Sequence, residues 1–175
     1  SGSKRATYQT ELPYVFIGSG GQGGGNTFEL MKEIIDHSSF LQKYACVVST
    51  GSNTILAQMI KAYIALKNVH HILILPTTDD IDEYMRGARF GVGKLGPNFL
   101  FESLALEKSV VATIYIPGQE DVIVAYVREK NIGWVELDTH NAFTRIYQVL
   151  EEQGWMKLLP QVQHEKSVYI LSAQE

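Results

Sequence analysis

The chain has 175 residues, 45% of them hydrophobic and 19% charged, which is typical of a single globular domain with a substantial core. Its net charge of -4 argues against nucleic acid as a partner, because no basic patch is implied. Cys46 is the only cysteine, which excludes an internal disulfide and a cysteine-based metal cluster and leads us to expect a reducing, cytoplasmic location.

Strand-like and helical patterns alternate along the chain. Apolar runs predict strands at 14–17, 45–48, 71–75, 90–93, 110–116 and 133–137. Helical spacing predicts helices at 28–35, 56–63, 81–88, 99–108, 122–130 and 142–152. Asn26, Asn53 and Asn98 are expected to lie at helix N-caps. From Trp155 onward no clear period is found, and Pro160 is expected to interrupt this segment.

This alternation predicts a single Rossmann-like, doubly wound α/β domain with a mainly parallel six-stranded sheet. We expect residues 1–10 to be a cloning remnant or linker, because the chain begins Ser1-Gly-Ser3. Residues 11–153 are expected to form the domain. Residues 154–175 are expected to be a C-terminal tail that packs on this domain or on a missing N-terminal half. Ligands of such sheets bind beyond the carboxyl ends of the strands, where the unusual loops of this chain fall.

A glycine-rich loop, Gly18-Ser-Gly-Gly-Gln-Gly-Gly-Gly-Asn26, follows the first predicted strand. It satisfies the dinucleotide pattern G-x-G-x-x-G, so an NAD site must be considered. The NAD site also needs an acidic residue at the end of the second strand, where this chain has Val48-Ser-Thr-Gly51. The remaining interpretations are a phosphate-binding loop, in which Gly20, Gly21, Gln22 and Gly23 offer backbone amides, and a tight turn without a ligand.

Two further loops carry polar groups. Lys94-Leu-Gly-Pro-Asn98 precedes a helix in which Glu102 lies about one turn from the start. Lys94 can neutralise a phosphate and Glu102 can accept hydrogen bonds from two ribose hydroxyls, although both residue types are also common on solvated helix surfaces. Pro117-Gly-Gln-Glu120 ends the clearest strand. Gln119 and Glu120 can bind sugar hydroxyls, or they can serve only to start the next helix.

Catalytic groups are poorly represented in the sequence. The histidines show no metal-binding spacing, and the serines near the glycine loop form no nucleophile elbow. We therefore expect a binding site for a nucleotide-sugar, without a bound metal or other cofactor.

The motifs in these loops resemble the C-terminal, donor-binding half of GT-B glycosyltransferases. The branch they resemble includes diacylglycerol glycosyltransferases and the peptidoglycan GlcNAc transferase. The similar segments are Ser19-Gly-Gly-Gln-Gly-Gly-Gly25, Lys94-Leu-Gly-Pro-Asn-Phe-Leu-Phe-Glu-Ser-Leu-Ala105, and Ile116-Pro-Gly-Gln-Glu120 with Tyr126 and Gly133. The resemblance runs from about Tyr14 to Leu150, and the Pro-Gly-Gln-Glu motif is its most specific part.

The resemblance implies a role for several residues. Glu102 would bind the ribose of a UDP-sugar, while Lys94, Gly96, Asn98 and the glycine loop would lie at the diphosphate. Gln119 and Glu120 would contact the sugar, and the strand end from Leu75 through Thr77 to Thr78 would hold the uracil. The resemblance also implies transfer of a hexosyl group to an acceptor, expected to be a lipid.

Four positions depart from the family pattern at places where the family contacts its donor. Pro97 replaces a glycine and offers no N–H to a phosphate, and Phe99 stands where a threonine often follows. Ile123 replaces an asparagine, and Arg89 replaces an aspartate before the fourth strand.

GT-B enzymes have two such halves, and the N-terminal half binds the acceptor and usually supplies the catalytic base. We therefore expect that half as a partner, in the same polypeptide or as a separate chain, and that any peripheral membrane contact runs through it. Alone, this chain should bind donor but transfer little or no sugar. The alternatives are a noncatalytic binding or scaffolding module, a UDP-sugar epimerase or hydrolase, and, least favoured, an NAD-dependent oxidoreductase.

Overall fold

The computed structural model describes residues 8–20 and 25–174, which form six strands and nine helices. The strands are β1 (Tyr14–Gly18), β2 (Ala45–Gly51), β3 (Ile72–Pro76), β4 (Gly91–Lys94), β5 (Val110–Ile114) and β6 (Gly133–Val135). The helices are α1 (Thr27–Asp36), α2 (Ser38–Lys43), α3 (Thr54–Lys67), α4 (Ile81–Gly87), α5 (Pro97–Ala105), α6 (Asp121–Lys130), α7 (Thr139–Glu151), α8 (Gly154–Lys157) and α9 (Leu159–Ser172).

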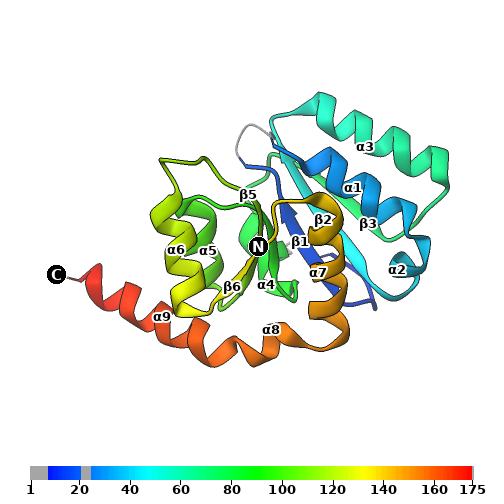
Figure 1. Ribbon diagram of the computed structural model, residues 1–175. Coiled ribbons are helices and arrows are strands. Elements are labelled where there is room, and N and C mark those ends of the chain that lie inside the picture. The colour runs from blue at the N-terminus through cyan, green and yellow to red at the C-terminus, as the bar shows by residue number, and fades with distance from the viewer. Residues whose placement is uncertain (1–7, 21–24, 175) are drawn as a thin grey trace, which may run out of the picture.

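All strands pair in parallel in one sheet of order β3-β2-β1-β4-β5-β6 (Figure 1). This is the doubly wound Rossmann order, so the predicted fold class is confirmed. The chain runs outward from β1 to β3 and then returns to the other side of β1. The direction of winding therefore changes between β1 and β4, and the helices that follow these two strands diverge there.

Both faces of the sheet are buried, which explains why the strands read as continuous apolar runs. Val15 and Ile17 of β1 pack into a core with α1, α2, α3 and α7. Tyr14 and Phe16 point to the other face, where they pack with Met85 of α4. A third cluster joins β5 to α5, α6 and the C-terminal helices.

Helices α2, α8 and α9 were not predicted from the sequence. Pro160 lies in the first turn of α9, where a helix needs no N–H donor, so it begins this helix rather than interrupting the segment. Leu158 and Val162 are buried against the cluster of α5 and α6, and α8 and α9 run beneath the other helices toward the C-terminus (Figure 1). Contact between this segment and an N-terminal half stays a prediction.

The predicted caps have mixed outcomes. Asn53 caps α3 as expected, since its side chain accepts a hydrogen bond from Leu56 N at 2.9 Å. Asn26 lies at the N-cap of α1, but its side chain instead donates to the carbonyl of Thr113 on β5 at 3.0 Å. The start of α1 is thereby tied to the end of a strand beyond β4. Within the described residues, no helix is long and apolar enough to cross a membrane.

Candidate functional site

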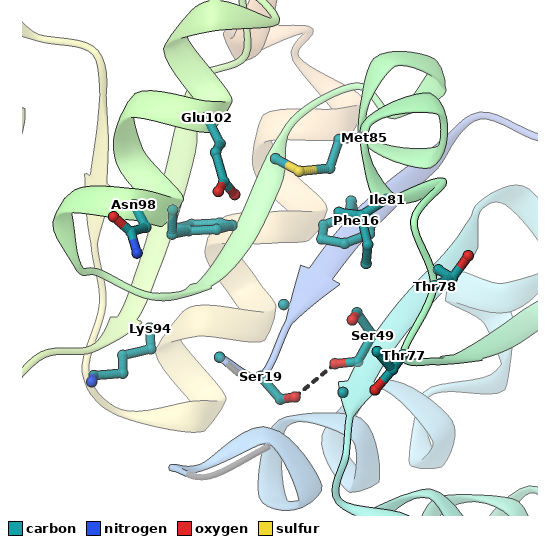
Figure 2. Close-up of a pocket in the computed structure, with 14 residues that line it drawn as sticks. Phe16, Ser19, Ser49, Thr77, Thr78, Ile81, Met85, Lys94, Asn98 and Glu102 are labelled. Atoms are coloured by element: carbon teal, nitrogen blue, oxygen red, sulfur yellow. Dashed lines mark hydrogen bonds between the residues drawn. The ribbon is translucent and has the colours of Figure 1, made fainter. Parts of the chain in front are cut away.

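The candidate site is a cavity of about 380 Å³ where the winding of the sheet changes direction, beyond the ends of β1 and β4. Ligands of open α/β sheets bind at this place because the diverging loops leave a crevice there. Figure 2 shows side chains from β1, β2, α4 and α5 around the same space. The lining residues are Phe16, Gly18, Ser19, Gly20, Ser49, Gly51, Thr77, Thr78, Ile81, Met85, Lys94, Asn98, Phe99 and Glu102.

Close backbone approach shapes the base of the cavity. Gly18 of β1 pairs with Gly93 of β4, and a Cβ on Gly93 would lie 2.1 Å from the Gly18 carbonyl oxygen. Gly93 also has a φ of +153°, which L side chains rarely adopt. A Cβ on Gly91 would lie 3.1 Å from the Phe99 ring, so the ring occupies room that this glycine leaves free. Phe99 is thus packed against the strands as part of the cavity wall.

The polar side of the cavity comes from β4 and α5. Lys94 ends β4, and Asn98 and Glu102 lie four residues apart on α5, so they share one face of that helix. All three line the cavity, and Figure 2 shows them along one side of it. The prediction that Asn98 caps α5 is wrong, because Gly96 is the N-cap and Pro97 begins the helix.

The first turn of α5 offers backbone amides beside these side chains. Leu100 N donates to Gly96 O at 3.1 Å, which is the first hydrogen bond of the helix. The amides of Asn98 and Phe99 precede it, and such amides, together with the helix dipole, favour an anion. Pro97 removes one donor from this turn but also has the backbone conformation that a first helical residue needs. An anion-binding helix start is therefore compatible with Pro97.

Among the titratable groups that line the cavity, Glu102 has a clearly shifted pKa. Partial burial, together with the nearby charge of Asp82, raises the pKa of the Glu102 carboxyl above its ordinary value. The side chain still has access to solvent, so the carboxylate can serve as an acceptor for hydroxyl groups at neutral pH.

The opposite side of the cavity combines hydroxyl groups with apolar side chains. Ser19 Oγ donates to the Ser49 carbonyl at 2.6 Å, which joins the ends of β1 and β2 (Figure 2). Thr77 and Thr78 follow β3, and Ile81 of α4 adds an apolar surface. Sequence reasoning did not assign Ser19, Ser49, Ile81, Met85 or Phe16 to the site. Of these five, only Ser19 and Ser49 could have been inferred from the sequence, because they lie near the ends of predicted strands.

The glycine loop is described only in part. Gly20 lines the cavity with a φ of +79°, and a Cβ there would meet no atom of the other described residues within 4 Å. Gly21, Gln22 and Gly23 lie outside the described residues. Their contact with a phosphate therefore stays a prediction.

The turn between β5 and α6 does not line the cavity. Gln119 is exposed, whereas Glu120 is only 8% exposed and its carboxylate accepts a hydrogen bond from Ile116 N at 2.5 Å. The other carboxylate oxygen of Glu120 lies 3.6 Å from Lys94 Nζ. The two turns are therefore joined by an ion pair. The expected contacts of Gln119 and Glu120 with a sugar stay predictions.

Two other expected residues also lie beside the cavity rather than in its lining. Leu75 is buried, and its carbonyl accepts a hydrogen bond from Thr50 Oγ1 at 3.3 Å. Gly96 lies next to Glu120, whose Oε1 would be 3.2 Å from a Cβ at this position. Uracil and diphosphate contacts by these backbones stay predictions.

Two departures from the family pattern have a structural explanation. Ile123 packs into the core between α5 and α6. Arg89 precedes β4, at the amino-terminal end of the strand and so away from the cavity. Its guanidinium there lies 5.2 Å from the centre of the Trp155 ring. Neither residue lines the cavity, so these two substitutions alter packing rather than the crevice itself.

The histidines and the single cysteine lie away from the cavity. Its lining, as far as the structure describes the chain, includes no histidine. His140 Nδ1 is 3.1 Å from Glu33, and His71 Nδ1 is 2.7 Å from the Leu41 carbonyl, both outside the crevice. Burial raises the pKa of the Cys46 thiol to about 12, so it is not a nucleophile at neutral pH.

Comparison with known proteins gives one match in sequence and many in structure. No protein-family model matches the chain. Over 139 residues the chain is 27% identical to a processive diacylglycerol β-glucosyltransferase of Bacillus cereus, covering 79% of this chain and 35% of the enzyme. The chain therefore spans about a third of that relative's length.

The similar structures share the fold at low sequence identity. A glycosyltransferase from Rickettsia africae has a TM-score of 0.70 at 14% identity, with 94% of this chain and 44% of that chain covered. A UDP-GlcNAc 2-epimerase from Neisseria meningitidis, bound to UDP-GlcNAc, has a TM-score of 0.67 at 15% identity, with the same coverage of both chains. The resemblance predicted from the motifs is confirmed at the level of the fold: this chain has the architecture of one half of a GT-B glycosyltransferase.

Proposed function

We propose that this chain is the donor-binding half of a hexosyltransferase and that it binds a UDP-sugar in the cavity beyond β1 and β4. The observation that carries the proposal is the order of groups along one side of this cavity. Lys94, the amides that begin α5 and Glu102 follow one another there, and an apolar surface faces them. A nucleoside diphosphate needs the same order: a cationic and amide-rich end, an acceptor for ribose, and a surface for the base.

The diphosphate would lie at the start of α5. Lys94 Nζ supplies a positive charge, and the amides of Asn98 and Phe99 point toward an anion at the helix start. Gly20 and the glycine loop beyond it would approach from the other side, since a loop without side chains lets phosphate oxygens reach the backbone. This arrangement stabilises phosphate charge through amides and a lysine, without a metal.

The nucleoside would extend along α5 toward α4. Glu102 lies one turn beyond Asn98, at a spacing that suits hydrogen bonds from the ribose hydroxyls to its carboxylate. The uracil would then lie near the end of β3, with Thr77 and Thr78 on one side and Ile81 of α4 beside it. The hexose would leave the diphosphate toward Gln119 and Glu120, which stay candidate contacts to the sugar.

We further propose that the acceptor is a lipid and that its binding groups and the catalytic base belong to a second half. The relative in Bacillus cereus is described as a diacylglycerol glucosyltransferase, and this chain covers 35% of it. The absence of histidine from the described lining of the cavity is consistent with a base supplied from elsewhere. Alone, the chain should bind the donor and transfer little or no sugar.

Calorimetric titration of the chain with UDP, UDP-glucose, UDP-galactose, UDP-GlcNAc and NAD tests this proposal. We expect saturable binding of UDP and at least one UDP-sugar, with no binding of NAD. Failure of every UDP species to bind would contradict a donor site and favour a noncatalytic scaffold. Binding of NAD alone would contradict both and point to an oxidoreductase.

A UDP-sugar epimerase is the second candidate, because the fold matches the epimerase of Neisseria meningitidis with a TM-score of 0.67, the same as for a glycosyltransferase of lipopolysaccharide biosynthesis. An epimerase converts UDP-GlcNAc without an acceptor, whereas a donor half should leave it unchanged. Incubation of the chain with UDP-GlcNAc, followed by chromatography of the nucleotide-sugars, separates these functions. A new UDP-hexosamine peak would support the epimerase.

A further inference from the structure

A second surface of the molecule lies on the outer side of α3. Ile55, Met59 and Leu66 are 69%, 42% and 75% exposed, respectively, and Ala62 completes a stripe with them at helical spacing. Leu56 and Ile60 on the other side of the same helix are buried in the core. α3 is thus apolar on both sides, although only one side has the core to cover it.

The charge around this stripe differs from that of the chain as a whole. The chain carries a net charge of -4, yet residues 37–78 contain no aspartate or glutamate. Within α3 the charged residues are Lys61 and Lys67, both exposed. The neighbouring helix α1 supplies Glu29, Lys32, Glu33 and Asp36. Asp36 lies 3.2 Å from Lys67. The helix α3 is therefore itself apolar and basic on an acidic protein, and of its two lysines it is Lys67 that pairs with Asp36.

Two aromatic rings lie at the junction of α1 and α3. Phe28 and Tyr63 form an edge-to-face pair with ring centres 6.2 Å apart. Lys32 Nζ lies 5.7 Å from the Phe28 ring and Lys67 Nζ lies 5.5 Å from the Tyr63 ring. A tyrosine ring and long cationic side chains with apolar stems are typical of surfaces that meet both an apolar phase and water.

We infer that the outer side of α3 binds an anionic membrane surface, with Ile55, Met59 and Leu66 entering the headgroup region and Lys61 and Lys67 meeting lipid phosphates. An interfacial helix needs an apolar face and flanking basic residues, and α3 has both. The inference does not depend on the donor site. It differs from the membrane contact expected through an N-terminal half, because it assigns contact to this chain.

A second copy of the chain is a poorer occupant of this surface. Pairing of two α3 helices would bring the lysines of both copies, which carry like charge, to one interface, and it would leave no acidic residue within α3 to oppose them. A bilayer surface needs no matching groove, so it can receive a convex helix at the edge of the molecule. Figure 1 shows α3 as an outermost helix, beside α1 and far from the C-terminus.

Flotation with lipid vesicles tests the inference, using phosphatidylcholine alone and phosphatidylcholine mixed with phosphatidylglycerol. The chain should float with the mixed vesicles and not with phosphatidylcholine alone. The double variant Ile55→Ser/Leu66→Ser should lose most of this binding, and Lys61→Glu should weaken it by about fivefold or more. Both serine substitutions replace highly exposed side chains, so the unfolding transition should be retained.

The matched control is Val168→Ser/Leu171→Ser on α9, where both side chains are also exposed, at 46% and 65%. This variant should bind the mixed vesicles as the unaltered chain does. Equal binding to both vesicle types, no binding at all, or equal loss in the two double variants would each overturn the inference. It would also be overturned if sedimentation showed a dimer that Ile55→Ser/Leu66→Ser disrupts while vesicle binding is absent.

Discussion

Two strand-to-helix turns of the molecule, β4 to α5 and β5 to α6, are built alike. The carboxylates associated with them point in different directions. Each turn follows a parallel strand and leads into a helix, and each is associated with a glutamate that the family resemblance assigns to the donor. Glu102, in the helix after the first of these turns, lines the cavity, and its pKa is raised by partial burial and by Asp82. Glu120 of the second turn is buried and accepts a hydrogen bond from Ile116 N in its own turn.

A motif residue can therefore contribute to a site without facing it. Glu120 fixes the end of β5 through Ile116 and lies 3.6 Å from Lys94, which does line the cavity. We therefore expect substitutions of Glu120 to act chiefly on stability and those of Glu102 chiefly on binding.

A Glu120→Ala variant should be markedly less stable than the unaltered chain. Removing the carboxylate leaves Ile116 N without its acceptor and Lys94 without its counterion, which should lower the free energy of unfolding by about 2 kcal/mol. Urea denaturation followed by circular dichroism measures this change. Glu120→Gln is the control, because it keeps an acceptor for Ile116 N and should lose less. Unchanged stability in Glu120→Ala, with loss of UDP-sugar binding alone, would instead favour direct contact with the sugar.

A Glu102→Gln variant should lose about tenfold in affinity for UDP, because a neutral amide accepts ribose hydrogen bonds less strongly than a carboxylate. Its free energy of unfolding should stay the same or rise slightly, since the repulsion from Asp82 is removed. Calorimetry with UDP gives the affinity, and Glu129→Gln on the exposed surface of α6 is the control. Equal affinity in both variants would exclude Glu102 from the site.

The dependence of UDP affinity on pH should be smaller but diagnostic. Glu102 must be ionised to accept the ribose hydrogen bonds, so affinity should fall as pH falls through its raised pKa. The fall should begin above the range of an ordinary glutamate, whose pKa is about 4.3. The raised pKa itself disfavours the folded state above that pKa, so this one contribution to stability improves as pH falls while affinity worsens.

The Glu102→Gln variant supplies the control for this measurement, because UDP also titrates. The difference between the two pH profiles isolates the carboxyl group. Identical profiles would mean that another group causes the dependence.

A Gln119→Ala substitution should change the protein little. Gln119 is exposed, so the free energy of unfolding should change by less than about 0.5 kcal/mol and affinity for UDP should be unchanged. Only the preference for a UDP-sugar over UDP should decrease, by a few-fold, as expected for one hydrogen bond to the hexose. Titration with both ligands measures this ratio. An equal loss for UDP and the UDP-sugar would place Gln119 at the nucleotide instead.

The strands, the doubly wound class of the sheet and one side of the cavity could be predicted from the sequence. Parallel strands buried on both faces have a strong apolar signal, and Lys94 and Glu102 are held by the regular spacing of β4 and α5. The opposite side could not be predicted, because Phe16, Ile81 and Met85 resemble any core residue until β1 and α4 are placed together. The orientation of the Glu120 side chain could not be predicted either, because it depends on contacts with Ile116 and Lys94 rather than on spacing.

Helix α5 lines the cavity and also packs on α9, so removing α9 would disturb the cavity. On one side Asn98 and Glu102 line the cavity, and on another Phe101 stacks on Tyr169 of α9 with ring centres 4.6 Å apart. Ending the chain at 153, the boundary expected from sequence, would remove this stacking together with Val162. Amides of α5 should then exchange with solvent faster, and the donor cavity would be measured on a loosened helix. A useful minimal fragment therefore keeps α9.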